Sequence, residues 1–186
     1  MSELVGSPAE RGAEPEGAFL TRRCEREAMG ELTGTQHGDA ANDLMVFYQQ
    51  EAEKLEAAGS YFMAAIALGF ALEAAVLAYL LVEWGDDNGG ELKVPDSVAF
   101  YDLIEAANEL DLLGAPTKVP SELAGDVEAP KHLAKDVVDT IRRFRNLIHP
   151  ARALKESFTP RSFTIGELQD FKDKYWSVVY SLLYNL

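Results

Sequence analysis

The segment Tyr61–Val82, YFMAAIALGFALEAAVLAYLLV, is a continuous apolar run that is interrupted only by Gly69 and Glu73. By length alone, such a run is able to span a bilayer. Its many alanines make it only weakly lipophilic, however, and inserting Glu73 near its middle would cost roughly 3 kcal/mol. We therefore expect no membrane span. The run predicts a helix that is buried on most faces at the centre of a bundle, where small residues let neighbouring helices approach closely.

Segments on both sides of this run have the apolar periodicity of amphipathic helices. We expect four further helices, over about residues 43–58, 97–113, 131–149 and 164–186. Thr164 with Glu167 three residues later is typical of a capping box at the start of the last helix. No strand signal, internal repeat or glycine-rich phosphate loop is evident. The sequence therefore predicts an all-α, up-and-down bundle of four to five helices.

Residues 1–40 carry scattered Gly, Pro, Glu, Ser and Ala without apolar periodicity, so we expect a disordered tail followed by one helical domain over 41–186. The single cysteine, Cys24, excludes an intrachain disulfide and a multi-cysteine metal site. The start of the chain lacks the basic and apolar regions of a signal peptide. We expect a cytoplasmic protein. The acidic loop at 86–90 lacks the spacing of a calcium loop, so no metal or cofactor is assigned.

The charge of the chain is unevenly distributed. The formal net charge is −14, and residues 41–91 contain only one basic side chain, Lys54. Residues 131–161, in contrast, contain more Lys and Arg than Asp and Glu. A strongly acidic protein is not expected to bind nucleic acid non-specifically. A basic island within it still permits a local contact with phosphate.

That island contains the stretch Ile141–Pro150, IRRFRNLIHP. On an ideal helix, Arg142, Arg145 and His149 share one side because they are spaced three and seven apart. Asn146 lies on the same side, whereas Arg143 points away. A separate apolar stripe is formed by Val137, Ile141, Phe144 and Ile148. One helix can thus bury its stripe and still present a polar cluster.

The cluster has the residue types that RNA cleavage without a metal requires. Such cleavage needs a base, an acid and cations that stabilise the phosphorane. The imidazole of a histidine is suited to proton transfer, and arginine forks match phosphate oxygens. One histidine cannot serve as acid and base at once, and His132 lies 17 residues earlier. A symmetric dimer would bring two copies of His149 together. Alternatively, the arginines only pair with carboxylates, such as Arg143 with Asp139.

The stretch Ile141–Pro150 resembles the signature of the HEPN superfamily, which combines Arg-Asn with a following His and Pro. The segment Gly69–Leu77 is similar to the Ala-rich second helix of that family, and Val98–Ala107 is similar to the helix before the motif. The resemblance covers residues 41–186. It implies a helical bundle that dimerises through the motif helices. It also implies a metal-independent endoribonuclease, as in many members, which frequently act as toxins or in phage defence.

By position, the resemblance makes His149 the catalytic histidine and Asn146 its polar companion. We expect Arg142 and Arg145 to bind and stabilise phosphate. Arg143 satisfies the spacing found in the family but points away from His149 on an ideal helix, so it is a further candidate for substrate binding. Glu73 is either a buried partner of one of these arginines or a carboxylate directed to solvent.

The leading expectation is therefore a cytoplasmic, homodimeric, metal-independent ribonuclease without a cofactor, acting as a toxin or stress-response effector. An antitoxin or another protein partner is compatible with this expectation, but the sequence does not identify one. An alternative is a catalytically silent HEPN-like module that binds nucleotide, RNA or a protein. A third possibility is a helical adaptor in which the cluster only holds helices together.

Overall fold

The computed structural model describes residues 31–81, 93–95, 98–110, 112–113 and 134–184. Within these ranges, five helices are ten residues or longer: α2 (Gly34–Ala57), α3 (Tyr61–Tyr79), α5 (Phe100–Glu109), α7 (Ala134–Arg145) and α9 (Ile165–Tyr184). Shorter pieces are η2 (Asn146–Ile148), α8 (Pro150–Lys155) and η3 (Pro160–Ser162). The predicted all-α bundle is confirmed.

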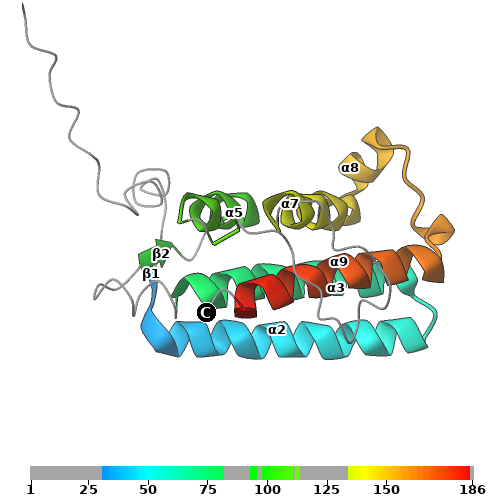
Figure 1. The fold of residues 1–186 in the computed structure, drawn as a ribbon. Coiled ribbons are helices and arrows are strands. Elements are labelled where there is room, and N and C mark those ends of the chain that lie inside the picture. The colour runs from blue at the N-terminus through cyan, green and yellow to red at the C-terminus, as the bar shows by residue number, and fades with distance from the viewer. Residues whose placement is uncertain (1–30, 82–92, 96–97, 111, 114–133, 185–186) are drawn as a thin grey trace, which may run out of the picture.

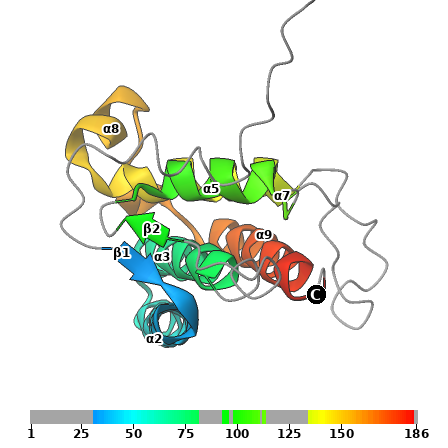
Figure 2. The same cartoon turned by 90° about the vertical axis from the view of Figure 1, so that its left-hand side faces the viewer.

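The long helices are arranged in layers (Figures 1 and 2). Helices α2 and α3 form an antiparallel hairpin, and α9 runs beside α3 in the same direction. Helices α5 and α7 lie side by side in a layer that crosses over α3 and α9 (Figure 2). The α2–α3 turn contains Gly59, whose φ of 73° is left-handed and favours glycine.

Helix α3 is the centre of the core. It packs against α2, α5, α7 and α9, and most of its residues are buried. By length and composition α3 also resembles a membrane span, but 67% of its most apolar stretch is buried inside the protein. Core helices of soluble proteins have the same composition. The apolar run thus forms the central helix that the sequence predicted.

Two features at the N-terminal side differ from expectation. Residues Glu31–Thr33 (β1) pair antiparallel with Lys93–Pro95 (β2), two strands for which the sequence showed no signal. Strands of three residues are too short to show a period of two in the sequence. Helix α2 begins at Gly34, within the segment that we assigned to the tail. Cys24, His132 and the loop at 86–90 lie outside the described residues.

The motif segment is broken into three pieces. Helix α7 ends at Arg145, a 3₁₀ turn follows, and His149 has an extended backbone with ψ of 122°. Pro150 then occupies the first position of α8. A proline disfavours helical geometry in the residue before it, but its fixed φ suits the first turn of a new helix. The expectation of one helix to His149 was therefore wrong by one turn.

The end of the chain follows its sequence signals closely. The Thr164 backbone N–H donates to the Glu167 carboxylate over 2.6 Å, and the Glu167 N–H donates to the Thr164 hydroxyl over 3.3 Å. This reciprocal pair is the predicted capping box, and it starts α9. The backbone N–H and the hydroxyl of Thr164 both donate to the Glu167 carboxylate, and they lower the pKa of this carboxyl because they favour its charged form.

Candidate functional site

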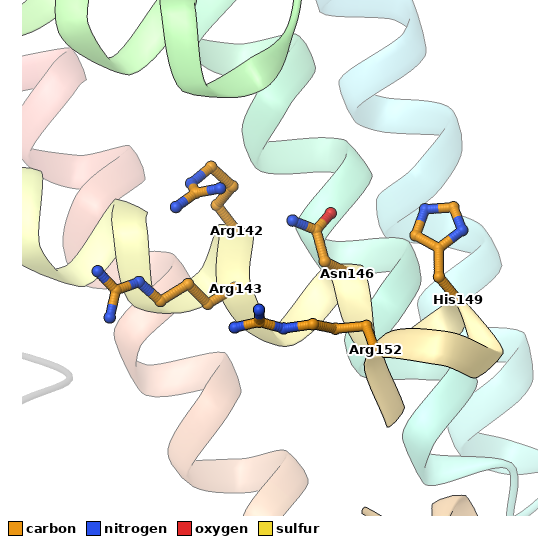
Figure 3. A pocket seen from close by; sticks show the side chains of 5 residues that line it. All are labelled: Arg142, Arg143, Asn146, His149 and Arg152. Carbon is orange, nitrogen blue, oxygen red and sulfur yellow. The ribbon is translucent and has the colours of Figure 1, made fainter. Parts of the chain in front are cut away.

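Polar side chains from α7, η2 and α8 line an open depression of about 580 Å³. Its lining residues are Arg142, Arg143, Asn146, His149 and Arg152. Figure 3 shows Arg142 pointing toward α5, and Arg152 reaching back from α8 toward α7. Four of the five were candidates from the sequence. The structure brings them together although the single helix expected to carry them is broken.

Asp139 holds two of the guanidiniums. Its Oδ1 accepts hydrogen bonds from Nε and Nη2 of Arg142 at 2.9 and 2.7 Å. Its Oδ2 lies 2.6 Å from Nε of Arg143. One carboxylate thus orients both arginines at the edge of the depression. The pairing of Arg143 with Asp139 is the one that we weighed as a purely structural role.

His149 and Arg152 complete the depression. The imidazole is exposed, and among the described residues it has no hydrogen-bond partner. Nη2 of Arg152 lies 2.8 Å from the carboxylate of Glu156, the residue that directly follows α8. The charged groups here are three arginines and two paired carboxylates, Asp139 and Glu156. The depression therefore keeps an excess of one positive charge on a protein whose net charge is −14.

Arg145 does not line the depression. Its guanidinium forms an ion pair with Glu73 of α3, and its side chain is only 16% exposed. It also lies over the rings of Phe70 and Phe100, at 4.9 and 5.3 Å from their centroids. Burial lowers the pKa of Arg145 from its ordinary value. The carboxylate of Glu73, which we expected either in an ion pair or in solvent, is thus engaged by Arg145.

Gly69 makes room for Arg145. A Cβ at this position would lie 3.1 Å from Cβ and 3.2 Å from Cγ of Arg145, closer than side chains normally pack. Gly69 lies one helical turn before Glu73, so both residues are on the face of α3 that receives Arg145. The arginine is therefore built into the α3–α7 interface.

The expectation that Arg145 shares a face with His149 was wrong. Ala134, Val138 and Ile141 are buried, and their spacing of four and three continues to Arg145 four residues later. The core face of α7 thus includes Arg145, whereas we had placed the stripe along Phe144. Arg143, which would point away from His149 on an ideal helix, lines the same depression as His149, because α7 ends before His149.

Arg152 was missed by sequence reasoning. It lies three residues after His149 and two after Pro150. The signal that we missed is Pro150, because proline is favoured in the first turn of a helix. The helix that starts there carries Arg152 back toward the motif. Recognising α8 would have added Arg152 to the cluster.

Phenylalanine packing fixes the position of α8. After α8, Ser157 adopts a left-handed φ of 53°, and the chain returns Phe158 to the bundle. Its ring contacts Phe62 of α3 and Phe144 of α7, with centroids 5.1 and 5.9 Å apart. Phe163 contacts the same two rings. This anchor holds the segment that carries His149 and Arg152 against α7.

Comparisons with protein-family models, curated proteins and solved structures found no match to this chain. Among the described residues, no three His, Cys, Asp or Glu side chains are grouped so that they would hold a metal ion.

Proposed function

We propose that this protein is a HEPN-like, metal-independent endoribonuclease whose site is the depression between α7 and α8. The observation that carries the proposal is one exposed imidazole, His149, beside three guanidiniums on an acidic protein. A guanidinium donates two parallel hydrogen bonds to the oxygens of a phosphate, and an imidazole transfers protons near neutral pH. Cleavage of a phosphodiester by proton transfer needs both groups in one site.

In this proposal, the guanidiniums of Arg142, Arg143 and Arg152 bind the scissile phosphate and stabilise charge on the phosphorane. His149 removes the proton of the ribose 2′-hydroxyl, which attacks the adjacent phosphorus. The P–O5′ bond breaks, and the products are a 2′,3′-cyclic phosphate and a 5′-hydroxyl. Asn146 orients the ribose or the imidazole. Arg145, which we expected in the catalytic set, instead has a structural role.

The leaving 5′-oxygen also needs a proton. The described part of one chain places one imidazole in the depression, His149. A homodimer that pairs the two depressions would supply a second copy of His149 as the acid. Because the reaction needs this acid, we propose that residues of two subunits together form each active site.

The test is to incubate end-labelled single-stranded RNA with the protein in EDTA, beside His149→Ala. We expect cleavage by the wild type, cyclic-phosphate ends, and a rate at least about 100-fold lower in the variant. No cleavage by the wild type, or equal cleavage by the variant, would overturn the proposal. Mass measurement in solution at several protein concentrations tests the dimer separately.

A catalytically silent module that binds RNA or nucleotide is the second candidate. One observation favours it: each guanidinium of the depression already pairs with a carboxylate, Asp139 or Glu156. These pairs reduce the positive potential that a transition state would experience. Tight binding of RNA by wild type and His149→Ala alike, without cleavage, would identify this second function.

A further inference from the structure

An exposed aromatic ring lies next to the depression. Tyr101 is in the first turn of α5, directly after Phe100, which is buried in the core. Tyr101 is 41% exposed. The Tyr101 ring therefore borders solvent in the layer that also carries the depression.

Arg142 connects this ring to the depression. Its guanidinium carbon lies 5.3 Å from the centroid of the Tyr101 ring, within the range of a cation–π contact. The same guanidinium lines the depression, and Figure 3 shows it directed toward α5. Asp139 fixes its orientation through two hydrogen bonds. The ring and the phosphate-binding groups are thus separated by one oriented side chain.

This juxtaposition matches the shape of a nucleotide. A nucleotide carries a flat base one sugar away from its phosphate. A phosphate bound to Arg142 would therefore place its base near the Tyr101 ring of α5. Aromatic rings and arginine planes are the surfaces on which proteins stack unpaired bases. Bases in a duplex are already stacked on one another and are not available to such a ring.

We propose that Tyr101 is a base-stacking subsite, and that the ligand of the depression is a single-stranded RNA whose base stacks on Tyr101 while its phosphate binds Arg142 and Arg143. This proposal rests on the proposed function and names its substrate class. It assigns α5 to the site, although none of the residues lining the depression comes from α5.

The test measures fluorescence anisotropy of two uncleavable ligands with the full chain. One is a short 2′-O-methyl oligouridylate, and the other is the same sugar–phosphate chain without bases. We expect Tyr101→Ala to lower affinity for the oligouridylate about tenfold and to leave affinity for the base-free chain unchanged. Tyr101→Phe keeps the ring and should bind as the wild type does. Phe47→Ala is the matched control, because Phe47 is 51% exposed on α2, on the other side of the bundle (Figure 1).

Three results would overturn the subsite. The first is equal binding of both ligands by the wild type. The second is an equal loss for both ligands in Tyr101→Ala, which would show that the ring only supports Arg142. The third is tighter binding of an oligouridylate–oligoadenylate duplex than of the single strand. If the wild type binds neither ligand, the proposed function itself fails, which is a different outcome. The wild-type comparison does not depend on how well any variant folds.

Discussion

Arg145 and Glu73 form an ion pair that joins the last turn of α7 to the middle of α3. The pair is enclosed by Phe70 and Phe100, and Gly69 leaves the space that it occupies. Arg145 is the residue directly before Asn146, where the 3₁₀ turn of the motif begins. The pair therefore fixes the point at which the chain leaves the core and enters the depression.

Removing one partner of this pair should destabilise the protein. Loss of one member of a buried ion pair costs about 3–5 kcal/mol. These side chains are 16% and 25% exposed, so we expect about 2 kcal/mol for Glu73→Leu or Arg145→Met. The double variant Glu73→Leu/Arg145→Met should recover most of the loss. Urea denaturation of the single and double variants measures these values. Additive losses would contradict the pairing.

The effect of Gly69→Ala on the stability of the protein should change sign when the residue at position 145 is changed. Alanine gains about 1 kcal/mol of helix propensity over glycine, but its Cβ would crowd Arg145. Overpacking costs about 1–3 kcal/mol, so the wild-type background should lose stability. In an Arg145→Gly background no Cβ remains at position 145, so the crowding disappears and Gly69→Ala should stabilise. Thermal melts of the four proteins give the comparison. The same sign in both backgrounds would argue against the contact.

Neutralising Asp139 should increase affinity for phosphate. A unit charge about 6 Å from a bound phosphate costs about 3 kcal/mol at an effective dielectric of 20, before screening by salt. The orientation that Asp139 provides is worth about 1 kcal/mol or less. We therefore expect Asp139→Asn to bind a 2′-O-methyl oligonucleotide at least about fivefold more tightly. Asp136→Asn is the control, because Asp136 is exposed on α7 and lines no part of the depression. Weaker binding by Asp139→Asn would show that orientation matters more than repulsion.

Alkaline pH should weaken the bundle through Tyr175. This side chain is fully buried, and burial raises its pKa to about 12, although a 2.7 Å hydrogen bond from Gln49 acts in the opposite direction. The phenol stays neutral in the folded protein while the unfolded chain ionises near pH 10. The stabilisation is complete below pH 10 and is lost as pH rises toward 12, by up to roughly 3 kcal/mol. Urea midpoints at increasing pH should show this fall. A Tyr175→Phe variant should lack that part of the slope.

Several features of the fold could be predicted because their causes are local. The apolar run of α3, the Gly59 turn and the Thr164–Glu167 capping box all depend on residues within a few positions. The arrangement of α5 and α7 across α3 could not be predicted, because it depends on how separate faces pack.

The site was predictable in composition but not in geometry. The stretch Arg142–His149 identified four of the residues that line the depression. The sequence could not decide between Arg142 and Arg145, since both lie close to one face of an ideal helix. That choice is made by Glu73 and Gly69, which are more than 70 positions away. The sequence marked Glu73 as a possible partner of one of these arginines, but the local pattern does not show which arginine it pairs with.

The central claim is that the exposed imidazole of His149 transfers a proton, and chemical rescue tests it most directly. The measurement is single-turnover cleavage of labelled RNA in EDTA by His149→Ala, with and without added imidazole. The depression is open and large enough to admit free imidazole. We predict that imidazole restores cleavage in His149→Ala, with no effect on the wild type. Cleavage by His149→Ala at the wild-type rate, or a low rate that does not respond to imidazole, would contradict the account.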